Sequence, residues 1–313
     1  MADADRAEAR PSAVGRPGPR DVALMAVAVA AISTSAPLIA ATAAPALAIA
    51  FWRNGFGTLA IAPFALTGAR RRELRAMDRR EWRLTTTSGG LLALHFATWV
   101  PSLTYTSVAS STALVATQPV WAALIARATG HDVPPRAWVG MAVAFAGVLT
   151  LTGIDLTLST RAVVGDLLAL AGAVFAAAYV TVGSRVRQTV STTTYTFVCY
   201  GVCAALLLAA CAIGRVQLVG FEPVTWLQLL ALTAGAQLLG HSLINVVLQT
   251  SSPTVVSLAI LFEMPGAAII AAVWLGQHPP WGVIPAALLL LAGVAIVVDS
   301  DRRRAGPVEA PPG

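Results

Sequence analysis

Long apolar runs recur along the whole chain, and short polar stretches separate them. A run of about 18 or more apolar residues is long enough to cross the hydrocarbon core of a bilayer as a helix. The pattern predicts an all-α polytopic membrane protein with ten transmembrane helices. The expected spans are at about residues 22–41, 45–67, 84–104, 108–127, 136–153, 163–183, 193–213, 226–248, 254–275 and 281–298.

The second half of the chain repeats the first at an offset of 146 residues. Between 84–151 and 230–297, 17 of 68 positions are identical. These positions include His95 and His241, Pro119 and Pro265, and the triplet AGV at 146–148 and 292–294. Each half holds five expected spans, and because five is odd, the second half must enter the membrane from the opposite side. The sequence therefore predicts two inverted five-helix repeats, an architecture of many secondary transporters.

The repeat and the polar ends divide the chain into four expected units. They are a disordered cytoplasmic tail at 1–21, a first repeat at 22–153, a second repeat at 163–298 and a cytoplasmic tail at 299–313.

The composition excludes the main soluble classes of protein. Hydrophobic residues make up 57% of the 313 residues and charged residues only 12%, whereas an average soluble domain carries about 25% charged residues. The mean hydropathy of +0.73 agrees, so a soluble enzyme is not expected. The three cysteines, Cys199, Cys203 and Cys211, fall in one apolar run and are expected to be small core residues. No phosphate-binding loop or metal-site motif is present, so we expect no catalytic residue, cofactor or metal. The arginines lie in short clusters between apolar runs, which favours a membrane protein, so no nucleic-acid partner is expected.

The arginines predict the orientation in the membrane. All 21 basic residues are arginine, and placing the N-terminus in the cytoplasm puts 18 of them on that side and two on the other. This asymmetry predicts cytoplasmic termini in a bacterial-type plasma membrane. The segment 69–83 alone carries seven arginines. We interpret it mainly as a topology determinant, with a lipid-binding basic patch as the alternative.

The two halves also resemble a known family. The segment TYTSVASSTALVATQPVWAALIARATGHDVPPRAWVGMAVAFAGVLTL and its echo SSPTVVSLAILFEMPGAAIIAAVWLGQHPPWGVIPAALLLLAGVAIVV are similar to the EamA repeat of the drug/metabolite transporter superfamily. Further likenesses are GDLLALAGAVFAAAYVTVGSRVR at 165–187 and AFWRNGFG at 50–57. The resemblance implies a ten-span transporter of amino acids, sugars, nucleotide precursors or drugs. A Gly-Glu pair frequent in the family is replaced here by Gly130-His131 and Gly276-Gln277.

Glu263 is the main candidate for a functional residue inside the membrane. It lies in the middle of the ninth expected span, in LAILFEMPGAA, and ionisable residues at that depth are costly and usually face a cavity or a partner. We predict that it binds a proton or a cationic group, with a buried structural role as the alternative. Pro265 is expected to bend the helix beside it.

Other polar residues in the spans are weaker candidates for binding substrate. Arg53 could bind an anionic group or balance the charge of Glu263. Asn54 lies beside Arg53, and Gln118 lies beside Pro119, where a second bend is expected.

The histidines form a pair related by the repeat. His95 and His241 could relay protons or bind substrate, or they could join helices by hydrogen bonds. Trp99 and its repeat counterpart Asn245 lie one turn further along and suit a ligand with polar and apolar parts. Asp21 and Asp166 open their expected spans and are interpreted as favourable acids at helix N-termini.

The predicted function is secondary transport of a small metabolite, amino acid or drug by alternating access, with export as the direction and protons as the candidate coupling ion. The expected partners are this small molecule and the lipid bilayer, and the oligomeric state is left open. A membrane-embedded hydrolase using His241, Ser242 and Glu263, and a non-transporting membrane scaffold, are the alternatives.

Overall fold

The computed structural model describes residues 18–247, 256 and 259–304, which form helices and connecting turns without a β-strand among them. The elements are α1 (Pro19–Ser33), α2 (Ser35–Ala41), α3 (Ala46–Ala65), α4 (Gly68–Ala76), α5 (Arg79–Tyr105), α6 (Val108–Val115), α7 (Gln118–Ala128), α8 (Pro135–Leu158), α9 (Thr160–Val186), α10 (Thr192–Ile213), α11 (Pro223–Ala231), the π-helical η1 (Leu232–Gly240), α12 (His241–Val247), α14 (Glu263–Leu275) and α15 (Val283–Arg304).

Within these residues, seven helical stretches are long and apolar enough to cross a membrane. They are Pro19–Ala41, Val108–Ala128, Pro135–Asp155, Thr160–Val186, Thr192–Ile213, Pro223–Ile244 and Val283–Ser300. The expected spans at 45–67 and 84–104 correspond to α3 and α5, whose polar side chains lower their hydropathy, and α14 is a shorter apolar helix. The chain is therefore an all-α, multi-pass membrane protein, and the total of ten spans stays a prediction.

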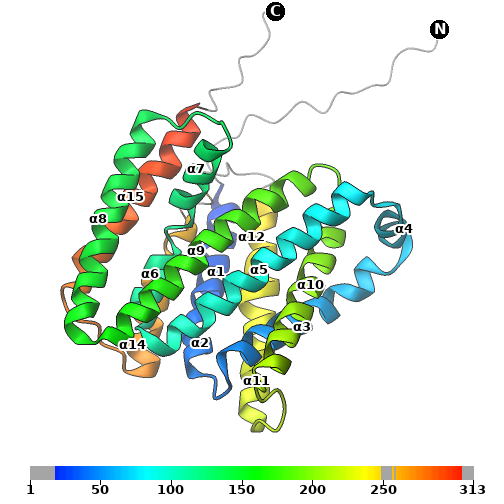
Figure 1. Cartoon of the computed structure of the whole chain (residues 1–313), viewed down its shortest axis with the longest axis horizontal. Helices are drawn as coiled ribbons and strands as arrows, with labels where there is room; N and C mark the ends of the chain where they lie inside the picture. Colours follow the sequence, from blue (N-terminus) through cyan, green and yellow to red (C-terminus); the bar gives the residue numbers. More distant parts are fainter. Residues whose placement is uncertain (1–17, 248–255, 257–258, 305–313) are drawn as a thin grey trace, which may run out of the picture.

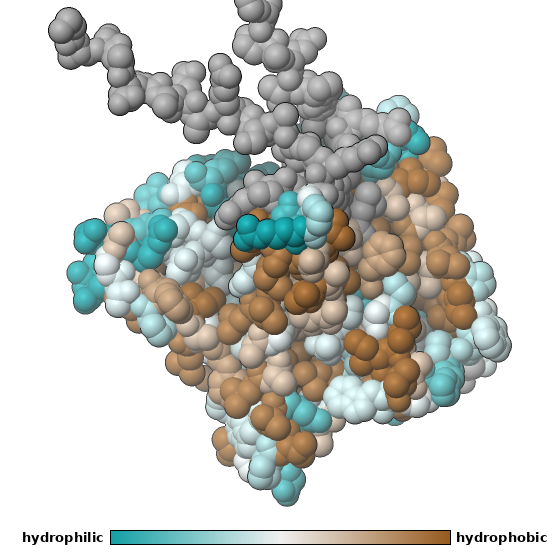
Figure 2. All heavy atoms as spheres, turned by 180° about the vertical axis from the view of Figure 1, so that it is seen from behind, coloured by the Kyte–Doolittle hydropathy of each residue, from teal (hydrophilic) through white to brown (hydrophobic). Residues whose placement is uncertain are grey.

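The surface has the polarity that a bilayer requires. Hydrophobic residues cover much of the face in Figure 2, and hydrophilic residues gather mainly toward its edges. In Figure 1, the start of α8 and the ends of α9 and α15 lie along the upper edge of the molecule, and α4 lies at its right-hand edge. We call this upper and right-hand edge the arginine-rich end, because these segments, with the start of α5 and the end of α7, carry the arginines of 70–83, Arg127, Arg136, Arg185 and Arg187.

The last helices of the two repeats pack against each other through their glycines. Along α8 and α15, the repeated AGV triplets place Gly147 and Gly293 at the contact. A Cβ on Gly147 would lie 2.6 Å from the backbone nitrogen of Leu290, and one on Gly293 would lie 2.6 Å from the carbonyl oxygen of Gly140. No side chain fits between backbones this close, so the glycines allow the two helices to cross in contact.

Two of the helical stretches are broken at positions that the repeat relates. A turn at Ala116–Thr117 separates α6 from α7, and a turn at Leu261–Phe262 precedes α14. The offset of 146 residues maps Ala116 onto Phe262. Pro119 and Pro265 lie in the first turn of α7 and α14, where a missing N–H removes no helical hydrogen bond. The bends expected at these prolines are thus full breaks that precede them.

The helix-terminus interpretation of the two aspartates holds for one of them. Asp21 lies in the first turn of α1. Asp166 does not open its helix, because α9 begins six residues earlier at Thr160, and Asp166 is fully buried. Ser159 caps α9 instead, since its Oγ accepts a hydrogen bond from the Ala162 N–H at 3.1 Å. The polar residues before 163 therefore extend the helix beyond its apolar part.

The cysteines of α10 are core residues, as expected. Cys199, Cys203 and Cys211 are each fully buried and free. The carbonyl oxygen of Cys199 would lie 2.8 Å from a Cβ on Gly89, so α10 and α5 approach closely there.

A carboxylate outside the membrane spans joins α4 to the start of α10. The Ser191 N–H and Oγ donate hydrogen bonds to the two carboxylate oxygens of Glu73 at 2.7 and 2.6 Å, and Thr194 Oγ1 donates another at 2.7 Å. Burial opposes ionisation, but the hydrogen bonds from Ser191 and Thr194 outweigh it and lower the pKa of Glu73 from 4.5 to about 2. We call this contact the Glu73 clamp.

The Glu73 clamp should make stability depend on pH in acid. Because the folded-state pKa lies below the unfolded value, its contribution is complete above the unfolded pKa and is lost as pH falls through the folded pKa. We expect Glu73→Gln to lower the free energy of unfolding at neutral pH by about 1–3 kcal/mol. Between pH 4.5 and about 2, wild type should lose this advantage, measured as the thermal unfolding midpoint of purified protein.

Glu222→Gln is the matched control, because the exposed Glu222 makes no side-chain capping hydrogen bond at the start of α11. An identical pH profile for Glu73→Gln and wild type would contradict the prediction.

Candidate functional site

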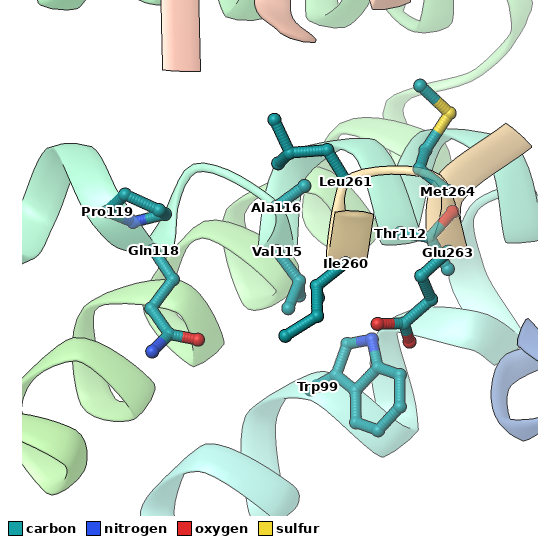
Figure 3. A pocket seen from close by; sticks show the side chains of 10 residues that line it. All are labelled: Trp99, Thr112, Val115, Ala116, Gln118, Pro119, Ile260, Leu261, Glu263 and Met264. Carbon is teal, nitrogen blue, oxygen red and sulfur yellow. The ribbon is translucent and has the colours of Figure 1, made fainter. Parts of the chain in front are cut away.

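A partly open cavity of about 190 Å³ lies between the two helix breaks. Its wall comes from α5, from both sides of the break between α6 and α7, and from the turn and first residues of α14 (Figure 3). The lining residues are Trp99, Thr112, Val115, Ala116, Gln118, Pro119, Ile260, Leu261, Glu263 and Met264. The cavity therefore lies between segments that the sequence repeat relates, with a mainly apolar wall and a few polar groups.

Glu263 is the acidic group of the cavity. It is the first residue of α14 and is half-buried, with Phe262 at the N-cap position. A carboxylate at a helix N-terminus is stabilised by the positive end of the helix dipole, typically by about 0.3–1 kcal/mol. In the described part of the chain, no residue forms an ion pair with Glu263 within 4.0 Å. The helix end therefore offsets only part of the cost of burying this carboxylate, which stays available to a ligand.

Trp99 provides a hydrogen-bond donor on the same side of the cavity. Figure 3 shows its indole nitrogen facing the carboxylate of Glu263. The side chain is buried, and among the described residues its Nε1–H finds no hydrogen-bond acceptor. A buried donor without a partner costs about 1–3 kcal/mol. A ligand that accepts this hydrogen bond would recover that cost.

The remaining polar groups differ in their availability. Gln118 is the first residue of α7, and its amide lies across the cavity from Glu263 (Figure 3). Thr112 is already engaged, because its Oγ1 donates to the Val108 carbonyl at 2.7 Å. The free polar surface of the cavity is therefore concentrated at Glu263, Trp99 and Gln118.

Arg53 lies behind the wall of the cavity. Its guanidinium is 4.7 Å from the ring centroid of Phe96 and 5.9 Å from that of Trp99. Its Nε donates to Gln237 Oε1 at 2.7 Å, and its Nη1 donates to Ser35 Oγ at 3.2 Å. The charges of Arg53 and Glu263 interact across this wall without an ion-pair contact. The described contacts of Arg53 are thus with the protein, and its guanidinium lies over the rings of Phe96 and Trp99.

The π-helical η1 positions the partner of Arg53. Gln237 belongs to this stretch, whereas the corresponding part of the first repeat, in α5, is α-helical. Gly57 allows α3 to approach, because a Cβ there would lie 2.6 Å from Gln237 Nε2 and 3.1 Å from Tyr200 Cδ2. π-Helical turns often occur at functional sites, since they redirect side chains from the α-helical pattern.

The other candidate residues from the sequence lie outside the cavity wall. His95 Nδ1 contacts the Gly172 carbonyl at 2.9 Å and therefore carries the proton, which joins α5 to α9. The ring of His95 stacks on Trp99, with 5.5 Å between centroids. Asn54 is fully buried, and its Nδ2 donates to the Ala50 carbonyl of its own helix. His241 and Asn245 are on α12, and their side chains lie outside the described residues.

The structure thus brings Glu263, Trp99, Gln118 and Pro119 together in one cavity, with Pro265 on the first turn behind Glu263. Arg53 and His95 contact Trp99 from outside the cavity. Sequence reasoning missed Gln237 and Ser35 as partners of Arg53. A polar residue within an apolar run was the available signal for Gln237, but helical periodicity does not reveal a π-helical turn.

Comparison with known families establishes the family of the chain. The model of the EamA-like transporter family matches residues 22–153 and 163–299, nearly the whole chain in two copies. The chain belongs to the EamA-like transporter family. Members are transporters of the drug/metabolite transporter superfamily, which assigns this EamA-like protein to membrane transport of small molecules.

Comparison with solved structures supports the fold of the chain and carries no information on its substrate. A solved crystal structure of a protein is 20% identical to this EamA-like chain and covers 91% of it and 99% of its own length, with a TM-score of 0.60. No curated protein matches the sequence.

The contact between Gly57 and Gln237 can be tested by substitution. Gly57→Ala should push the Gln237 amide away from Arg53 and lower the free energy of unfolding by about 1–2 kcal/mol, as expected for a hydrogen bond to a charged group less the helix preference of alanine. The measurement is thermal unfolding of purified protein.

Gly55→Ala is the matched control on the same helix, because no atom lies within 4 Å of a Cβ at Gly55. It should be as stable as wild type or more so. In a Gln237→Leu background, Gly57→Ala should cost nothing further. Equal effects of the two glycine substitutions in the wild-type background would refute the proposed contact.

Proposed function

We propose that this EamA-like protein is a secondary transporter that moves its substrate through the cavity between the two broken helices by alternating access. The observation that carries the proposal is the position of the cavity. Discontinuous helices at a repeat interface leave backbone groups and helix ends free to bind a ligand, which is how many secondary transporters build their substrate site. The turns at Ala116–Thr117 and Leu261–Phe262 form such a pair, and Glu263 lies at one of them.

The cavity favours a substrate with an apolar body and a polar or cationic end. Its volume of about 190 Å³ exceeds that of an engineered apolar cavity of about 150 Å³ that admits benzene, so one ring or a branched chain would fit. Ile260 and Val115 would contact the apolar body, while Glu263 and Trp99 would meet the polar end. Gln118 would bind a second polar group from the opposite wall.

Glu263 would also provide the coupling to protons. An ionised carboxylate inside a membrane protein is costly without a partner, so binding of a proton or of a cationic substrate group would relieve the same cost. Competition between the two for one carboxylate would exchange protons for substrate. Arg53 would hold the wall behind Trp99 and tune the charge of the site, and His95 would fix the orientation of that wall.

The orientation follows from the arginine-rich end. We place this end and both termini in the cytoplasm and the protein in a bacterial-type plasma membrane, because arginine-rich segments stay on the cytoplasmic side. With the proton gradient directed inward, proton entry through Glu263 would drive export of the substrate.

Glu263→Gln tests the coupling. It retains the shape and hydrogen bonding of the side chain but removes its titration, so flux driven by a pH gradient should fall to that of protein-free liposomes. Exchange of substrate at equal pH should persist with lower affinity, because glutamine still offers a hydrogen bond but lacks the charge that would meet a cationic end. The measurement is uptake of a panel of labelled amines, amino acids, sugars and nucleosides into proteoliposomes. Gradient-driven flux at the wild-type rate would show that the carboxylate is structural.

Trp99→Phe tests the indole N–H separately from the coupling. The ring stays, and the hydrogen bond that the indole would donate to the substrate is lost. We expect substrate affinity to fall about threefold to tenfold, in line with one neutral hydrogen bond. The response of flux to the pH gradient should keep its wild-type form. Unchanged binding in a direct titration would exclude the indole as a substrate contact.

A further inference from the structure

The segment that links α3 to α5 presents a dense cationic surface. It consists of exposed arginines on α4 and on the first turns of α5. We call it the arginine surface, and it comprises Arg70, Arg71, Arg72, Arg75, Arg79, Arg80 and Arg83. Topology requires positive charge at this end of the chain, but it does not require an ordered surface. What the structure adds is the arrangement of the charges.

The acidic residues of the same segment are occupied elsewhere. The carboxylate of Glu73 accepts three hydrogen bonds from the start of α10. Asp78 and Glu81 form a reciprocal capping box, in which each side chain accepts the other's backbone N–H at 2.7 and 3.0 Å. Among the described residues, Arg70 is the only arginine of this surface in an ion pair, with Glu73 at 3.3 Å. The local acids thus leave most of the cationic charge unbalanced.

The arginine surface is also held in place. The Glu73 clamp fixes α4 to the start of α10, Leu74 packs against the hydrophobic core, and Met77 is buried between α4 and α5. A surface that is already ordered loses little entropy when it binds a ligand. This order distinguishes it from an extended basic loop.

Apolar side chains adjoin the arginine surface. Phe64 and Leu66, at the end of α3, are 70% and 45% exposed, and Trp82, on the first turn of α5, is 39% exposed. Tryptophan is enriched at the boundary between hydrocarbon and headgroups. We therefore expect the charges to lie beside the chain's own entry into the bilayer, at the depth of the lipid phosphates.

We propose that the arginine surface binds the headgroups of anionic phospholipids in the adjacent leaflet. Guanidinium groups match phosphate oxygens in two-point hydrogen bonds, and the negative charge of the lipid supplies the missing counter-charge. The bound lipids extend the support of α4, and through the Glu73 clamp they stabilise the start of α10. This role is independent of the substrate cavity and of the direction of transport.

The test measures the binding of phosphatidylglycerol to purified protein in phosphatidylcholine nanodiscs. As the fraction of phosphatidylglycerol rises, the thermal unfolding midpoint of wild type should rise, and native mass spectrometry should detect retained phosphatidylglycerol. The variant Arg71→Gln/Arg72→Gln/Arg75→Gln should bind this lipid on the order of 100-fold more weakly, at about fivefold for each arginine. High salt should weaken binding to wild type.

Two control variants separate the effect of charge from the effect of position on α4, and a stability measurement checks folding. Replacing the same three arginines with lysine keeps the charge but removes the two-point hydrogen bonds, so the affinity should lie between those of wild type and the glutamine variant. Arg127→Gln removes an exposed charge on the last turn of α7, a helix that lies away from α4 (Figure 1), and it should leave binding unchanged. Equal midpoints in pure phosphatidylcholine show that the glutamine variant is folded. If the glutamine variant is not folded, the single variant Arg72→Gln replaces it in the test. Its affinity for phosphatidylglycerol should fall about fivefold.

Three results would overturn the proposal. The first is wild-type affinity for phosphatidylglycerol in the glutamine variant. The second is an equal loss in Arg127→Gln, which would show diffuse attraction rather than a surface on α4. The third is displacement of the lipid by inorganic phosphate at matched concentration, which would make the ligand a free anion.

Discussion

Every backbone polar group within the hydrocarbon must find a partner inside the protein, and this requirement governs both the fold and the site. It restricts the spans to helices and allows a break only where neighbouring helices or a polar cavity receive the exposed groups. The turns at Ala116–Thr117 and Leu261–Phe262 are breaks of this kind, and they face one shared cavity. The substrate site that we propose is therefore a place where the fold already departs from continuous helix.

Close contacts between helices, made at glycines, hold the helices around the cavity together. Gly147 and Gly293 bring α8 and α15 together, and Gly57 brings α3 to η1. Packing in a membrane depends on such small residues, because lipid is as apolar as the helix surface and provides no hydrophobic drive for association. Arg53 depends on the second contact, since its Nε is hydrogen-bonded to Gln237. The buried charge, the π-helical turn and the cavity wall at Trp99 thus form one connected unit.

The sequence predicts the helical class and the family, because span length and the repeat depend on residue type along the chain. It also singles out Glu263, Trp99 and Gln118, which line the cavity, since polar groups within apolar runs are conspicuous. It does not reveal that Arg53 contacts Gln237 or that His95 bonds to Gly172, because such contacts depend on how helices cross. Asp166 was misassigned as a helix start, because polar residues before the apolar run continue α9. The charges of 69–83 were visible, but their order depends on the distant Ser191.

The buried cysteines of α10 have a practical consequence for spectroscopy. Cys199, Cys203 and Cys211 are fully buried, so thiol reagents in water do not reach them in the folded protein. A single cysteine introduced at an exposed position would then take a spin label or fluorophore selectively in an otherwise native sequence. Distances between pairs of such labels could follow the opening and closing of either end of the molecule without first replacing the buried cysteines of α10.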